Sequence, residues 1–173
     1  MRELAGLYPG DPGIVISLML NRVTLAAGEV LYLPAGNIHA YLSGVGIELM
    51  AASDNVLRGG LTPKHVDVPE LLSVLDFRPV EVPYLEPVEP APGVAVYSPG
   101  LPDFALAVVT ADATYDIGGD GIALCTAGSF TIVGVHGSAT VSRGDSLFVT
   151  ADEGALAIAG AGELFVAGPG ARG

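Results

Sequence analysis

Three side chains between positions 39 and 48 could line one reactive cavity: the imidazole of His39, the phenol of Tyr41 and the carboxylate of Glu48. They flank Ser43-Gly44, a pair suited to a two-residue hairpin turn. If that turn sets the register, His39 lies opposite Glu48, and both share a face with Tyr41 because side chains alternate along a strand. A slip of one residue would scatter this cluster.

The chemistry of His39 stays open at this level. A histidine in an apolar stretch is commonly a core residue whose ring nitrogens are hydrogen-bonded. The alternative is that His39 is one ligand of a metal site. A single imidazole cannot hold a catalytic metal alone, so further protein donors would then be needed.

Short apolar runs separated by turns must position these side chains. We expect strands over residues 18–25, 30–34, 38–42 and 45–51. A leading proline and apolar residues at helical spacing predict a short helix over 69–76. This is the one stretch where helical spacing is clear, so the chain is expected to be mostly β.

Residues 77–92 combine recurring prolines with acidic residues, which predicts an extended connector. Beyond it the sequence returns to strand-like runs, and this pattern predicts an all-β fold, a sandwich or jelly roll. These runs are "FALAVVT", "GIALCTA", "SFTIVGV", "SATVSR", "SLFVTA", "ALAIAG" and "ELFVA".

The chain also repeats itself at an offset of 116 residues. Gly28 aligns with Gly144, and the segments that follow share glycines, acidic residues and apolar positions. Two copies of one β unit are the simplest interpretation. At this offset His39 aligns with Ala155, so only the first copy carries the imidazole.

Composition excludes several classes of partner. The net charge is −12 and the chain has seven Lys plus Arg, a balance that disfavours nucleic acid and anionic membrane surfaces. The single cysteine, Cys125, lies in an expected strand and is predicted to be buried and inert. We find no membrane span and no signal-peptide pattern, and we expect a cytoplasmic protein.

Three polar residues follow the fourth expected strand. By composition alone Asp54 is a turn residue, Arg58 a solvated charge and Lys64 an ordinary surface lysine. In a chain with so few cations, however, Arg58 and Lys64 lie close together in sequence, and a cation in a concave site would be conspicuous.

The segment from Gly28 to Ser43 resembles the second sequence motif of the cupins. Gly28, Pro34, Gly36 and His39 match four of its five fixed positions, and Ser43 replaces the final asparagine. The residues that follow, "GIELMAASDNVLRGGLTPKHVDVPELLSVLDF", closely resemble the C-terminal part of type I phosphomannose isomerases. "LYPGDPG" near the start and "ADEG" near the end are also similar to that family.

The resemblance implies a cupin jelly-roll architecture. Residues 1–76 would be the C-terminal part of a catalytic cupin domain, 77–92 the connector and 93–173 a second, metal-free cupin domain. In the family, zinc is held by a Gln-x-His pair, a glutamate and a later histidine. The first three lie in the N-terminal half, and this chain contains no glutamine. His39 corresponds to the last ligand, so the other Zn²⁺ ligands are expected outside the chain.

The resemblance also assigns roles to the polar residues. It places Arg58 in the active site, makes Asp54 or Glu48 the acid–base carboxylate, and puts Lys64 near a sugar phosphate; Tyr41 is a candidate substrate contact. The implied reaction interconverts mannose 6-phosphate and fructose 6-phosphate through a cis-enediol. The N-terminal half, if supplied in trans, would be the protein partner.

Three hypotheses follow. The first is a zinc-dependent isomerase represented by its C-terminal portion and inactive alone. The second is a non-catalytic carbohydrate-binding or regulatory cupin protein derived from that family. The third is a small cupin that binds another metal through His39 and further residues of the chain that the sequence does not identify.

Overall fold

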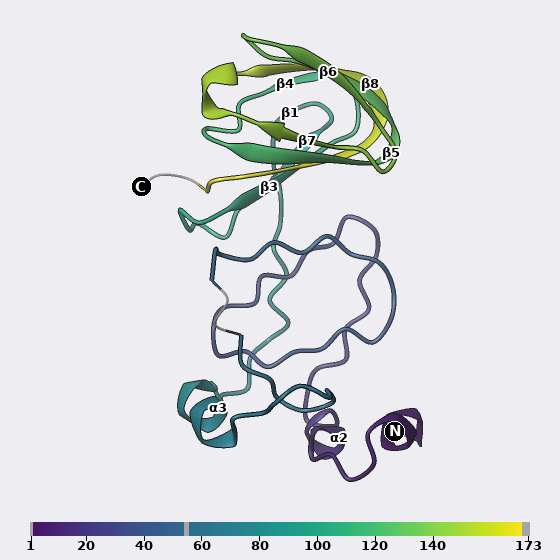
Figure 1. The fold of residues 1–173 in the computed structure, drawn as a ribbon, viewed down its shortest axis with the longest axis vertical. Coiled ribbons are helices and arrows are strands. Elements are labelled where there is room, and N and C mark those ends of the chain that lie inside the picture. Colours follow the sequence, from purple (N-terminus) through teal and green to yellow (C-terminus); the bar gives the residue numbers. More distant parts are fainter. Residues whose placement is uncertain (1, 54–55, 171–173) are drawn as a thin grey trace. The chain divides into compact units, whose positions relative to one another are not determined.

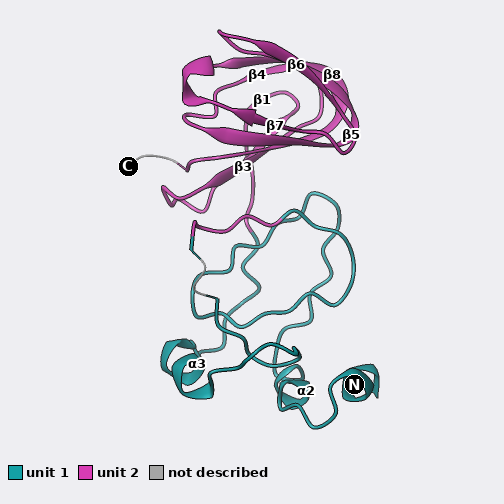
Figure 2. Cartoon of the chain, in the orientation of Figure 1, with its two compact units in different colours: residues 1–47, 53–84 teal, residues 48–52, 85–173 magenta. Residues whose placement is uncertain are grey.

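The structure is a computed structural model that describes residues 2–53 and 56–170. The chain divides into two compact units, coloured separately in Figure 2. The first unit comprises residues 1–47 and 53–84, and the second comprises residues 48–52 and 85–173. No helix in the described ranges is long and apolar enough to cross a membrane.

The second unit is one antiparallel sheet of eight strands. Its central order is β1-β2-β3-β8-β5-β6, with β4 paired to β8 and β7 paired to β5, and Figure 1 shows the strands curving around a common interior. The strands are β1 (Val88–Ala91), β2 (Val94–Tyr97), β3 (Ala105–Val109), β4 (Ala113–Tyr115), β5 (Gly121–Val133), β6 (Ser138–Ser142), β7 (Ser146–Val149) and β8 (Leu156–Gly168). A short 3₁₀ helix, η1 (Ala151–Glu153), precedes β8.

Two long strands, β5 and β8, carry the hydrophobic core. On β5 the buried side chains are Ala123 and Cys125 and then Phe130 and Ile132, so the inward positions change from odd to even numbers. A register shift between Cys125 and Ala127 accounts for this change, because one extra residue reverses the alternation. Burying a side chain as large as Phe130 contributes about 1.5–3 kcal/mol to folding.

The first unit holds three short helices: α1 (Arg2–Leu7), α2 (Gly13–Ile16) and α3 (Val68–Val74). The side chain of Asp67 caps α3 by accepting a hydrogen bond from the backbone N–H of Glu70 at 3.1 Å, and Pro69 lies in the first turn. The predicted short helix is therefore present, one residue earlier at its start and two residues shorter at its end.

The four strands expected between residues 18 and 51 do not form. In the described part of this stretch only one isolated bridge is present, between Leu31 and Tyr84. The predicted pairing of His39 with Glu48 is therefore wrong. A strand needs a hydrogen-bonding neighbour, and the exposed side chains of Tyr41, Leu42 and Val45 show that none of the described residues forms a second layer over this segment.

The all-β prediction is confirmed: the ordered secondary structure is mostly antiparallel sheet with a few short helices. Two details differ. Four of the expected runs merge in pairs into β5 and β8, because the connecting glycines continue the ladder instead of turning it. Strand β1 lies within the stretch expected to be a connector, and β2 and β4 were not expected at all.

The internal repeat has a structural counterpart. In the first copy the backbone N–H of Glu29 donates to the carbonyl of Ala26 at 3.1 Å, and the Glu29 carboxylate accepts from the N–H of Ala26 at 2.7 Å. In the second copy Asp145 and Ser142 make the same two hydrogen bonds, at 2.8 and 2.9 Å. The repeated glycines also share positive φ angles, +87° at Gly28 and +95° at Gly144.

Candidate functional site

The ring of His39 is oriented by the backbone. Its Nδ1 atom lies 3.0 Å from the carbonyl oxygen of Asn37. Because a carbonyl can only accept, Nδ1 must carry the proton, and in the neutral ring Nε2 then presents its lone pair. Metal-bound histidines are commonly held in this way, with the second ring nitrogen donating to a carbonyl or carboxylate. The side chain of His39 is exposed in this chain.

The ring of Tyr41 contacts the ring of His39. The two rings meet edge to face, with centroids 6.1 Å apart and planes inclined by 76°. Tyr41 is itself 74% exposed, so this contact is not part of a buried core. The structure therefore brings these two sequence-predicted residues together, although not through the expected hairpin.

The turn before His39 is anchored to the end of α3. Gly36 has a φ of +86°, and a Cβ at this position would lie 2.9 Å from the carbonyl oxygen of Val74. Its own carbonyl accepts a hydrogen bond from the N–H of Asp76 at 3.0 Å. Only glycine combines this φ with so close an approach, which is the physical reason for the glycine of the motif.

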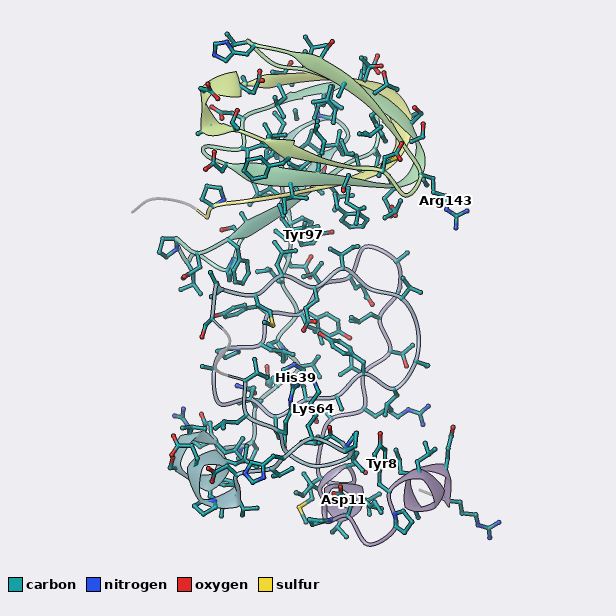
Figure 3. All side chains as sticks on the ribbon, viewed as in Figure 1. Tyr8, Asp11, His39, Lys64, Tyr97 and Arg143 are labelled. Carbon is teal, nitrogen blue, oxygen red and sulfur yellow. The ribbon has the colours of Figure 1, made fainter. Side chains whose placement is uncertain are left out.

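The loop that carries Arg58 and Lys64 packs against the neighbour of His39. A Cβ on Gly59 would lie 2.3 Å from Cδ1 of Ile38, so the two residues are in contact. Arg58 is partly exposed and Lys64 is exposed, with its backbone N–H donating to the hydroxyl of Thr62 at 3.2 Å. Figure 3 labels His39 and Lys64 within this unit.

The two candidate carboxylates are placed differently. Glu48 is exposed and belongs to the segment 48–52, which is grouped with the second unit. Asp54 lies outside the described residues, as does Asn55. Their roles therefore stay predictions.

Within residues 2–53 and 56–170 there is no group of three or more His, Cys, Asp or Glu side chains that could hold a metal ion. Two cavities of about 200 and 380 Å³ lie in the second unit, and neither is lined by a predicted site residue. His39 thus offers one suitable donor, which is fewer than a zinc site requires.

Asp11 makes two backbone contacts that its sequence context alone does not predict to be functional. Its carboxylate accepts backbone hydrogen bonds from Gly13 at 2.7 Å and from Leu61 at 2.9 Å. The first bond is a local turn contact of a kind that the "GDPG" sequence could have indicated. The second spans fifty positions, and nothing in one sequence reveals it.

The local geometry can be compared with known proteins. Mannose-6-phosphate isomerase from Escherichia coli is 35% identical over 169 residues, which cover 95% of this chain and 43% of that enzyme. The rat enzyme is 37% identical over 168 residues, covering 89% of this chain and 39% of its own length. The chain is a part-length member of the mannose-6-phosphate isomerase family. It spans less than half the length of these relatives and corresponds to their C-terminal portion.

Solved structures of the family agree. Phosphomannose isomerase from Salmonella typhimurium, in a crystal structure described as bound to fructose 6-phosphate and zinc, superposes with a TM-score of 0.86 at 33% identity. A variant of the same enzyme gives a TM-score of 0.88. Each alignment covers 98% of this chain and 44% of the other. A search against family models found no match.

Proposed function

We propose that this chain supplies part of the site of a zinc-dependent mannose-6-phosphate isomerase. The observation that carries the proposal is the Nδ1 contact of His39 with Asn37, which leaves Nε2 available as a metal ligand. It is supported by the similarity to an enzyme described as bound to zinc and fructose 6-phosphate. The remaining zinc ligands would come from outside the chain.

The polar residues would then act on the sugar phosphate. Bound zinc would supply Lewis-acid polarisation of the substrate oxygens. Asp54 or Glu48 would move a proton between C1 and C2, so that the substrate passes through a cis-enediol. Arg58 would stabilise the developing oxyanion charge, Lys64 would bind the phosphate, and Tyr41 would contact the sugar.

The first unit is proposed to need a complementary polypeptide. None of its described large hydrophobic side chains is buried, whereas Tyr41 and Leu42 are mostly exposed and Val45 fully so. Yet the chain superposes closely on the matching part of complete enzymes, so these segments keep the arrangement found where the rest of the enzyme is present. A β-rich polypeptide equivalent to the missing part of the relatives, in cis or in trans, would cover them.

In this proposal residues 1–76 form the C-terminal part of the catalytic cupin domain and residues 77–92 lead to a second cupin at 93–173. The second copy has Thr150, Asp152 and Ala155 at the motif positions of proline, glycine and histidine. We therefore propose a structural role, without metal, for the second cupin.

The test is isomerase turnover and zinc content measured on the same samples. The chain alone should show no turnover above background, and with the complementary polypeptide it should bind one zinc and turn over. His39→Ala should abolish both in that assembly, whereas His65→Ala, a matched change at an exposed histidine of the same unit, should leave both unchanged. Stoichiometric zinc in the His39→Ala assembly would exclude His39 as a ligand.

The second candidate is a non-catalytic carbohydrate-binding or regulatory cupin. It is favoured by the lack, among the described residues, of any group of three potential metal ligands. Sugar phosphate binding without zinc or turnover, also after addition of the complementary polypeptide, would favour this function over the isomerase.

A further inference from the structure

The carboxylate of Asp11 joins two parts of the first unit that are distant in sequence. Oδ1 accepts the N–H of Gly13 and Oδ2 accepts the N–H of Leu61. Asp11 is itself held in the turn between α1 and α2, since its N–H donates to Tyr8 and its carbonyl accepts from Ile14. Both side-chain bonds are partly buried and charge-assisted, which makes them stronger than neutral ones.

Leu61 is the residue at which this contact acts. Its φ is +53°, and it is the one non-glycine residue with positive φ among those described. A leucine in this region is strained, and such a conformation persists only when its surroundings hold it. The Asp11 carboxylate supplies that restraint at the N–H of Leu61 itself.

The residue before Leu61 is Gly60, and the packing around it leaves no room for a side chain at this position. A Cβ on Gly60 would lie 2.8 Å from Oδ1 of Asp11 and 3.3 Å from the Cα of Gly13. On the other side Gly59 rests on Ile38, the neighbour of His39. The loop is thus held between the Asp11 turn and the segment of His39.

The candidate substrate cations lie at the two ends of this held stretch. Arg58 precedes Gly59, and Lys64 follows Leu61 by three residues, with its N–H bonded to Thr62. Long cationic side chains bind an anion better when their backbone is already fixed, because less freedom is lost on binding.

We propose that Asp11 is a positioning residue that fixes the loop of Arg58 and Lys64 for the sugar phosphate. Its link to a substrate rests on the proposed function. The restraint of the loop by the carboxylate does not, so the two parts can be tested separately.

The test uses amide NMR of the ¹⁵N-labelled full chain. Loss of a charge-assisted hydrogen bond should speed hydrogen exchange at Leu61 by roughly tenfold or more in Asp11→Ala. Asp11→Asn keeps one acceptor oxygen and should give a smaller change. Glu29→Ala is the matched control: Glu29 also accepts a backbone N–H, from Ala26, within the same unit, and its loss should leave Leu61 unchanged.

Rescue distinguishes positioning of the loop from a general loss of structure. Glycine adopts positive φ without strain, so Leu61→Gly should reduce the effect of Asp11→Ala on the loop amides. If Asp11→Ala unfolds the first unit, Asp11→Asn with and without Leu61→Gly provides the comparison. The amides of β5 and β8 should stay unchanged throughout and report that the second unit is intact.

Fructose 6-phosphate is the ligand probe. In the assembly with the complementary polypeptide it should shift the amides of residues 58–64 of the wild-type chain, with an affinity lowered in Asp11→Ala and partly restored by Leu61→Gly. Unchanged Leu61 exchange in Asp11→Ala, or unchanged sugar phosphate affinity despite a freed loop, would overturn the proposal. Faster Leu61 exchange without any wild-type response to the sugar phosphate supports the restraint by Asp11 and contradicts the substrate role of the loop.

Discussion

The Nδ1 atom of His39 is 3.0 Å from the carbonyl oxygen of Asn37, and this contact decides which ring nitrogen can bind a cation. Asn37 contributes through its backbone, so the orientation depends on the turn and not on the asparagine side chain. The conformation of this turn depends on Gly36 and on its contacts with the end of α3.

The tautomer of His39 is the most direct consequence. The neutral ring should carry its proton on Nδ1, because only a donor can bond to the Asn37 carbonyl. Long-range ¹H–¹⁵N NMR of the histidine rings measures this directly. A neutral His39 with the proton on Nε2 would contradict the proposed ligand geometry.

Replacing Gly36 should disturb the turn that orients His39. Gly36→Ala forces a left-handed φ on alanine, at a cost of about 1–2 kcal/mol, and brings its Cβ against the Val74 carbonyl. Urea unfolding followed at the His39 ring should show lower stability of the first unit. Gly6→Ala is the control, because Gly6 lies in α1 with open space around it and should be neutral or stabilising.

The ion pair of Asp76 and Arg78 should make a pH-dependent contribution. The hydrogen bond from Arg78 lowers the pKa of Asp76 from 3.8 to about 2. Because the folded pKa is depressed, the stabilisation is present above pH 3.8 and is lost as the pH falls through about 2. NMR titration of the Asp76 carboxyl should show a midpoint near the lower value, which should rise in Arg78→Ala. Equal midpoints in both proteins would exclude the contact in solution.

Truncating a buried phenylalanine of the second unit should cost more stability than truncating an exposed one. Phe130 is 1% exposed, and Phe130→Ala should cost about 3–5 kcal/mol of unfolding free energy. Phe148, on β7, is 62% exposed, so Phe148→Ala should have a much smaller effect. Urea unfolding followed by circular dichroism compares the two. Similar losses of unfolding free energy in both variants would contradict the burial of Phe130 and the exposure of Phe148.

The sequence predicted the second unit better than the first. Alternating runs such as those of β6 and β7 carry their own signal, and their partners lie in the same chain. The run around His39 carries a similar signal, but a strand is a paired state, and the described chain offers this run no ladder partner.

The candidate site was predictable only in part. The spacing from Gly36 to His39 identified the imidazole, and the contact with Tyr41 follows from their proximity in sequence. The bond from Leu61 to Asp11 joins segments fifty residues apart, and the bond from His39 to Asn37 involves a backbone carbonyl. Neither kind of contact leaves a residue-type pattern in one sequence.

The matching turns at Ala26–Glu29 and Ser142–Asp145 also bear on how the molecule folds. One leads into a strand of the sheet and the other into a segment without a ladder, yet both close with the same pair of hydrogen bonds. This pair of hydrogen bonds is formed within four consecutive residues. Such short-range closure can precede distant pairing during folding, so both turns are candidate nuclei that form whether or not a neighbouring strand arrives.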